Sequence, residues 1–158
     1  VIKESVNSSW ATTYGAKAIG LTTPLIAAGS GAGQDLVDAT NGVIPSSLKK
    51  SSGFAISAAT QANPCIVTTA SHTGVAGAGD VVQIAGVTGM TELNGQSAYG
   101  TFPSLTTMSL TGINSTAYTA YVSGGTATVI DATHINPTGD LVIANTIAAT
   151  LPAAGSWI

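Results

Sequence analysis

The sequence predicts an all-β fold, a small antiparallel β-barrel or sandwich with an extended, mostly irregular N-terminal arm. From Phe54 onward, short segments alternate apolar and polar residues with a period of two, as β-strands do. Gly, Asn or Pro stands in the gaps between these segments, where turns are needed. Residues 1–53 lack the alternation. We therefore predict an arm over residues 1–53 and a β domain over residues 54–158.

The arm is interrupted by three turn-forming stretches, GLTTP, GSGAGQ and NGVIPSS. Short helices fit residues 8–18 and 34–39, but neither is long enough to be stable without a packing partner. Asp35 and Asp38 lie on the second of these helices, and no calcium-binding loop accompanies them. We therefore expect the arm to need a surface to pack on.

Seven segments of the β domain are expected to be strands, and regular short strands separated by turns are typical of an antiparallel barrel or sandwich. In the first of them, Phe54, Ile56 and Ala58 share one face. The segments are residues 54–60, 65–70, 80–87, 105–110, 118–122, 126–131 and 140–148.

The chain of 158 residues has few ionic groups: charged residues make up 7% of it, against about 25% in an ordinary soluble protein. It is nevertheless 44% hydrophobic, which argues against disorder. Between Glu92 and Asp131 there is no charged residue, so a long stretch lacks the charges that keep monomers and strand edges apart. This composition predicts burial against neighbouring subunits, including copies of the chain itself.

The charge balance excludes several partners. The only basic residues are four lysines, there is no arginine, and the net charge is −3, so little is available to neutralise phosphates. We therefore predict no nucleic-acid binding. The least charged early segment, residues 18–34, contains Pro24 and several glycines and predicts no membrane span. The start of the sequence does not resemble a signal peptide.

No catalytic, cofactor or metal site is predicted. Cys65 is the only cysteine and is expected to be a small strand residue. His72 and His134, the only histidines, lack a metal-ligand spacing and are expected to be solvated residues or turn residues. There is no G-x-S-x-G elbow, and GSGAGQ lacks the G-K-[ST] end of a phosphate loop. An enzyme is therefore the least favoured class.

Three motifs between residues 54 and 128 carry a family resemblance: ISAATQANPCIVTTASHTG, GDVVQIAGVTGMTELNGQ and INSTAYTAYVSGGTAT. They resemble a small β module that recurs in phage head and tail proteins and is labelled as similar to the first catalytic cysteine half-domain of ubiquitin-activating enzymes. The module is a β scaffold, so the resemblance implies no ubiquitin chemistry. It implies a structural protein of a bacteriophage virion, assembled in the bacterial cytoplasm.

Within the virion, a capsid decoration or cement protein is ranked slightly above a tail or neck component. The expected partners are the major capsid protein, other virion subunits and copies of the chain, and the apolar arm residues and the two tryptophans near the chain ends are the expected contacts. A receptor- or glycan-binding module of a fibre or surface filament stays open, because Tyr99, Phe102, Tyr118 and Tyr121 could stack on sugars. The contact residues are Ile2, Trp10, Ile19, Leu21, Leu25, Ile26 and Trp157.

Overall fold

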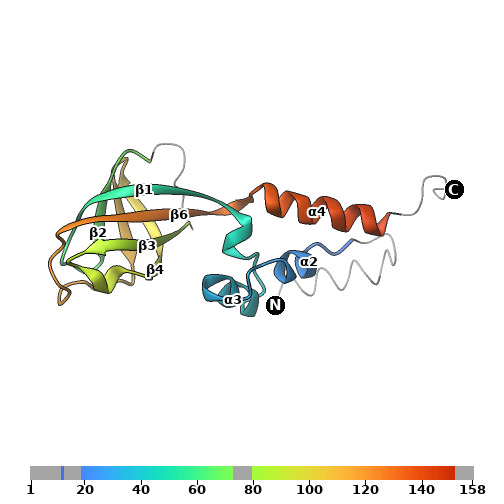
Figure 1. The fold of residues 1–158 in the computed structure, drawn as a ribbon, viewed down its shortest axis with the longest axis horizontal. Coiled ribbons are helices and arrows are strands. Elements are labelled where there is room, and N and C mark those ends of the chain that lie inside the picture. Colours follow the sequence, from blue (N-terminus) through green and yellow to red (C-terminus); the bar gives the residue numbers. More distant parts are fainter. Residues whose placement is uncertain (1–11, 13–18, 73–79, 152–158) are drawn as a thin grey trace. The chain divides into compact units, whose positions relative to one another are not determined.

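The chain divides into two units in this computed structural model, which describes residues 12, 19–72 and 80–151. One unit, here called the ring unit, is the continuous stretch 49–134 (Figure 1). The other, the helical unit, combines residues 1–48 with residues 135–158. The expected boundary after residue 53 thus lies near the start of the ring unit, while the C-terminal residues group with the N-terminal segment.

The ring unit is a six-stranded antiparallel sheet arranged in a ring in the order β1–β2–β5–β4–β3–β6. The mostly β fold expected from the alternation is confirmed. β1 continues farther toward the N-terminus than expected, and β6 extends beyond its expected segment at both ends. The strands are β1 (Lys49–Ala59), β2 (Cys65–Thr69), β3 (Val81–Thr88), β4 (Ser97–Ser104), β5 (Thr107–Thr111) and β6 (Ser123–Ile135).

Alternate residues of these strands point into one apolar core. The register pairs Val67 of β2 with Met108 of β5 and places Val82 of β3 beside both Ala98 and Val129. All five side chains are buried, because a period of two puts every second residue on the inner face. The core also holds Ile56, Cys65, Ile84, Val87, Met90, Leu93, Leu110, Ile113 and Ala127.

Within the ring unit, the structure differs from the expected strands at two places. Residues 118–122 form a loop instead of a strand, because Tyr118 and Tyr121 pack against the core from that loop and the Tyr121 hydroxyl donates to the Ile56 and Gly124 carbonyls. β4 was not expected, because Gly100 and Pro103 interrupt the alternation that marks a strand. Gly100 fits there because an added Cβ would lie 2.8 Å from side-chain atoms of Val82 and Phe102.

Gly89 fixes the loop that follows β3. Its φ of +87° lies in the left-handed region, and an added Cβ would stand 2.3 Å from the Ala120 carbonyl oxygen. The short 3-10 helix η3 (Thr91–Leu93) follows and buries Leu93 in the core. Next to it, the Glu92 carboxylate accepts hydrogen bonds from the Thr119 backbone N–H and hydroxyl, and these lower the pKa of Glu92.

The described part of the helical unit is more regular than the expected arm. It holds α2 (Thr22–Ala27), α3 (Gly33–Thr40), the 3-10 helix η2 (Ser46–Leu48) and α4 (Pro137–Thr150). α3 confirms the helix expected over residues 34–39, whereas the helix expected over residues 8–18 falls outside the described residues. In the ranges that the structure describes, no helix is both long and apolar enough to cross a lipid bilayer.

The strand expected over residues 140–148 was wrong, since α4 occupies this segment. The Asn136 side chain caps the helix by accepting from the Thr138 and Gly139 backbone N–H groups, and Pro137 fits the first helical turn. An apolar run with several β-branched residues does not separate strand from helix by itself. Gly139 lies against the Leu48 carbonyl, where an added Cβ would stand 2.9 Å from the oxygen.

Candidate functional site

The helix α3 turns its charged residues toward the interior of the helical unit. Asp38 is buried, and its Oδ2 accepts from the Ser46 backbone N–H at 2.8 Å and from the Ser46 hydroxyl at 2.6 Å. Its Oδ1 accepts from the Gln34 side-chain amide at 2.9 Å. Charge-assisted bonds of this kind are short and about twice as strong as neutral ones. Asp38 therefore fixes the segment after α3 onto the helix.

Asp35, one turn earlier, makes a second set of such bonds. Its carboxylate accepts from the Ser30 backbone N–H at 2.7 Å and from the Ser47 N–H and hydroxyl at 2.9 and 2.6 Å. Burial by itself raises the pKa of Asp35, but the bonds from Ser47 and Ser30 outweigh it and lower the pKa from 3.8 to about 2. Each of the two carboxylates therefore accepts three hydrogen bonds from its own unit, which gives both aspartates a structural role.

The apolar residues of α3 point the other way. Leu36 is 55% exposed and Val37 is 51% exposed, whereas Asp35 and Asp38 are 5% and 7% exposed. A surface helix ordinarily buries its apolar stripe and exposes its charges. α3 is therefore inverted in polarity, and we call the exposed surface of Leu36 and Val37 the α3 outer face.

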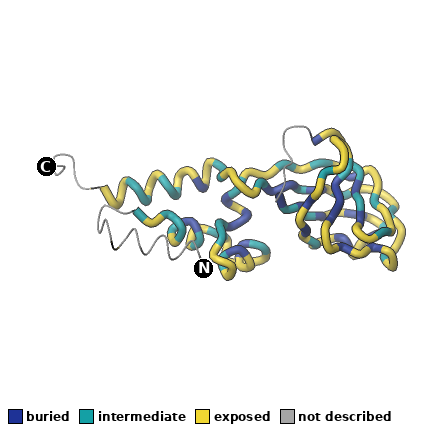
Figure 2. Tube along the Cα trace, turned by 180° about the vertical axis from the view of Figure 1, so that it is seen from behind, coloured by how far each residue is buried: buried dark blue, intermediate teal, exposed yellow. Residues whose placement is uncertain are grey.

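α4 shows a similar excess of apolar exposure. Its only buried residue is Gly139, and a half-buried stripe lies over Val142, Ile143 and Ile147 (Figure 2). Leu141 is exposed, as is Leu151 after the helix. α4 packs against α2 and η2, and among the described residues of this unit the buried apolar side chains larger than alanine are few: Leu25, Pro45 and Leu48. The helical unit thus has a thin core.

The structure places the expected assembly contacts unevenly. Ile2, Trp10 and Trp157 lie outside the described residues. Ile19, Leu21 and Ile26 are half-buried, while Leu25 is buried within its own unit. The exposed large apolar residues among the described part of this unit, Leu36, Val37, Leu141 and Leu151, were not among the expected contacts. The signal for the first two was the spacing D-L-V-D, in which two acids three residues apart flank the apolar pair.

His72 differs from its expected solvated state. It is only 3% exposed, and its ring lies edge-on to Phe54 of β1 and Phe102 of β4, at centroid distances of 6.0 and 5.4 Å. Its backbone N–H donates to the Leu105 carbonyl, which draws it inward after β2. Its Nε2 is buried without a hydrogen-bond partner in the described structure. An unsatisfied buried nitrogen destabilises the fold.

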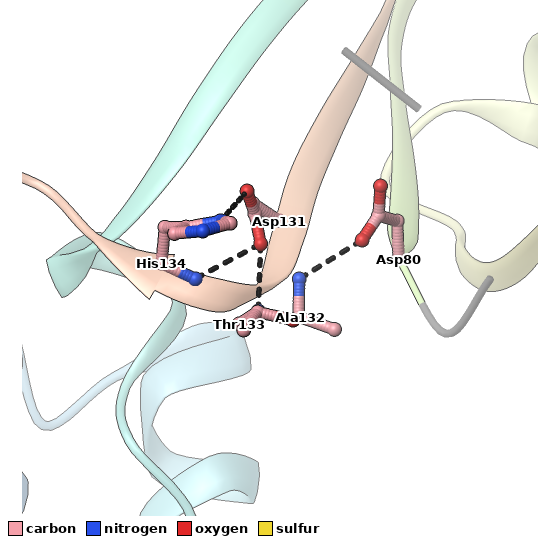
Figure 3. A network of polar contacts seen from close by, with 5 residues as sticks. All are labelled: Asp80, Asp131, Ala132, Thr133 and His134. Atoms are coloured by element: carbon pink, nitrogen blue, oxygen red, sulfur yellow. Dashed lines mark hydrogen bonds and ion pairs between the residues drawn. The ribbon is translucent and has the colours of Figure 1, made fainter. Parts of the chain in front are cut away.

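His134 is exposed, as expected, and pairs with Asp131 near the end of β6 (Figure 3). Its Nδ1 lies 2.7 Å from Asp131 Oδ2, while Asp131 Oδ1 accepts from the Thr133 and His134 backbone N–H groups. Burial raises the pKa of Asp131, but these bonds outweigh it and lower the pKa to about 2. Nearby, Asp80 Oδ1 accepts from the Ala132 N–H at 2.9 Å.

A histidine bonded to a carboxylate occurs in acid–base sites, but such sites also need a group for the imidazole to act on. Within the described ranges, the His134 ring bonds only to Asp131. Asp131 also accepts hydrogen bonds from the Thr133 and His134 backbone N–H groups, which gives its carboxylate a structural role near the end of β6.

The remaining reactive groups of the ring unit are enclosed or dispersed. Cys65 of β2 is fully buried and its thiol donates to the Thr60 carbonyl at 3.4 Å. Over residues 12, 19–72 and 80–151, no three His, Cys, Asp or Glu side chains are grouped so that they could hold a metal ion. Phe102, Tyr118 and Tyr121 pack partly against the core, while Tyr99 is exposed on the outer face of β4.

No protein-family model matches this sequence, and no curated protein matches it. The fold and the site define the class of the molecule as a mostly β protein that combines a ring unit with a helical unit whose described helices expose apolar side chains.

Proposed function

We propose that the chain is a structural protein of a bacteriophage virion, and specifically a capsid decoration protein that contacts capsid subunits and copies of itself. A place in the tail or neck is the nearest alternative. In this proposal the ring unit is a small closed barrel that serves as the rigid body, and the helical unit supplies the contacts.

The observation that carries the proposal is the inverted polarity of α3. A helix that buries two aspartates and exposes leucine and valine is unfavourable in an isolated subunit, because apolar surface remains in water. The same helix is favourable in a subunit whose outer face is covered by a neighbour. The sparse charge of the whole chain supports the same interpretation, since assembled subunits do not need ionic surfaces to stay dispersed.

The energies indicate many weak contacts. Covering a half-exposed leucine or valine stabilises an interface by about 1 kcal/mol, which is small against the cost of association. One copy would therefore bind weakly through these residues alone. Symmetric repetition over a shell multiplies the gain, because every copy adds the same contacts.

The proposal is tested by measuring whether the full-length chain binds capsid shells that are assembled from the major capsid protein encoded in the same genome. The full-length chain should bind expanded shells saturably and raise the temperature at which they disassemble, with unexpanded shells as the reference. Trp10→Ala should weaken binding if the arm makes contacts as expected, and Tyr99→Ala, which removes an exposed aromatic side chain of the ring unit, is the matched control.

Failure to bind either kind of shell would contradict the decoration role. Saturable binding to purified tail or neck complexes in its place would favour the nearest alternative. Binding to a glycan array that Tyr99→Ala abolishes would favour the receptor-binding class, for which the exposed Tyr99 is the best placed aromatic residue among those described.

A further inference from the structure

Asparagine is followed by glycine at two places in the sequence, Asn41-Gly42 and Asn94-Gly95. In this dipeptide the backbone nitrogen of the glycine can approach the asparagine side chain closely, because glycine has no Cβ to hinder it. Both glycines have a positive φ, +66° and +83°, with open space where a Cβ would lie, and both asparagines are exposed. The two pairs therefore differ only in the hydrogen bonds that hold them.

The pair in the ring unit is firmly held. Asn94 Oδ1 accepts from the Val87 backbone N–H at 2.8 Å, and Asn94 Nδ2 donates to the Val87 carbonyl at 2.9 Å. The Gly95 backbone N–H donates to the Ile84 carbonyl at 2.8 Å, and Leu93, just before the pair, is buried in the core. Any reaction between the Gly95 nitrogen and the Asn94 side chain thus requires three hydrogen bonds to β3 to break.

The pair in the helical unit is held less firmly. Asn41 directly follows the last residue of α3, and its side chain makes no hydrogen bond with any described residue. The Gly42 backbone N–H donates to the Ala39 carbonyl at 3.0 Å, in the last turn of the helix. Helix ends open at a lower free energy than hydrogen bonds next to a packed core. The Asn41 side chain can therefore reach the Gly42 nitrogen after a local opening of the helix end.

We propose that Asn41 is a site of spontaneous deamidation in the folded chain, and that its hydrogen bonds protect Asn94 from the same reaction. The Gly42 nitrogen forms a bond to Asn41 Cγ, the Cγ–Nδ2 bond breaks, and the Gly42 amide proton leaves with the amino group as ammonia. Water then adds across one C–N bond of the resulting five-membered imide, with its hydroxyl on the carbon and its hydrogen on the nitrogen. Opening at Cγ gives aspartate, and opening at the backbone carbonyl of residue 41 gives isoaspartate. This inference does not depend on the proposed function.

The reaction changes the end of α3 in two ways. Either product adds a negative charge at the C-terminus of a helix, where the macrodipole disfavours it, and changes the net charge from −3 to −4. Isoaspartate also lengthens the main chain by one carbon between Asp38 and Ser46, whose backbone N–H and hydroxyl donate to the Asp38 carboxylate. We therefore expect the reaction to weaken the contacts between α3 and the segment that follows it, and to leave the ring unit unchanged.

The proposal is tested by incubating the full-length chain in mildly alkaline buffer and following both sites by peptide mapping. Mass spectrometry detects the reaction as an increase of about 1 Da in the peptide that contains the site. In the folded chain Asn41 should react at least about tenfold faster than Asn94, because fewer hydrogen bonds must break. In denaturant the two sites should react at similar rates. Equal rates in the folded chain, or a rate ratio that denaturant leaves unchanged, would overturn the proposal.

Two matched variants test the structural consequence. Asn41→Gln should stop the reaction at this position, because glutamine would have to close a six-membered ring, while Asn145→Gln on α4 makes the same substitution at an exposed asparagine that precedes threonine. During incubation, amide hydrogen exchange protection over residues 30–48 should fall in the wild type and in Asn145→Gln and stay constant in Asn41→Gln. Constant protection in a wild type that has accumulated isoaspartate, or an equal loss in Asn41→Gln, would show that the reaction does not weaken the helical unit.

Discussion

The two units of this chain solve the problem of stability in different ways. The ring unit surrounds one apolar core, to which every strand contributes. The helical unit buries few apolar side chains and is fastened by carboxylate–serine hydrogen bonds, while leucine and valine stay outside. The difference teaches that hydrogen bonds can fix a region locally while apolar side chains stay exposed to water. Burial of those side chains against another subunit would then contribute free energy to association.

The largest expected effect contrasts two leucines. Leu110→Ala in the ring core should lower the free energy of unfolding by about 2 to 5 kcal/mol, because it leaves a cavity among buried neighbours. Leu36→Ala on α3 should change it by less than about 0.5 kcal/mol. Denaturant unfolding of the dilute full-length chain measures both. Equal losses of unfolding free energy in the two variants would show that Leu36 is buried, and the proposed difference between the two units would then be wrong.

The second largest effect is expected from removal of the Asp35 carboxylate. Asp35→Ala removes three hydrogen bonds and leaves the Ser30 and Ser47 donors without their acceptor, so the helical unit should lose about 2 to 3 kcal/mol. Amide hydrogen exchange over residues 30–48 measures the loss without depending on the ring unit. Asp140→Ala, at an exposed position in the first turn of α4, is the control and should leave this protection unchanged.

The same carboxylate predicts acid sensitivity. The pKa of Asp35 is lowered from 3.8 to about 2 in the folded chain, so the unfolded chain binds its proton first as pH falls. The stability that this group contributes, about 2 kcal/mol, is present above pH 4 and is lost as pH falls toward 2. Hydrogen exchange over residues 30–48, measured at several pH values, should show protection decreasing as the pH falls from 4 toward 2. Asp35→Asn should make this decrease smaller. A decrease of the same size in Asp35→Asn would assign the effect to another group.

The smallest effect should have the opposite sign. His72→Leu removes a buried nitrogen without a partner and keeps apolar bulk between Phe54 and Phe102, so the ring unit should gain about 1 kcal/mol. His134→Leu is the control, because His134 is exposed and its pairing with Asp131 contributes at most about 1 kcal/mol. Thermal unfolding measures both. A loss of stability in His72→Leu would mean that the imidazole has an essential partner.

The sequence predicted the ring better than the helical unit, for physical reasons. In β1, β2, β3, β5 and β6, apolar and polar residues alternate because one face of the strand lies on the core and the other faces water. These strands were therefore recognised from local pattern alone. β4 was missed because glycine and proline interrupt its pattern. α4 was mistaken for a strand because its Val, Ile and Thr residues suit both structures, and the capping role of Asn136 becomes clear only with the helix in place.

The candidate site was only partly predictable. The helix α3 was expected, but its orientation was not, because the inward direction of Asp35 and Asp38 depends on serines that reach them from both sides of the helix. The burial of His72 could not be derived from its neighbours in sequence either, since Phe54 and Phe102 come from distant strands. Local pattern thus specified most element types, and polar contacts with residues outside the helix decided which face of α3 is exposed.

One link at the base of the helical unit has a practical consequence. The Asn136 backbone N–H donates to the Leu48 carbonyl at 2.9 Å, and the Asn136 side-chain amide donates to the Ser47 carbonyl. The polypeptide therefore leaves the helical unit and returns to it at adjoining points, with residues 49–134 inserted between them. An unrelated domain with neighbouring ends could be grafted at these points. Such a chimaera would contain the inserted domain in place of residues 49–134 and would keep the sequence of the helical unit unchanged.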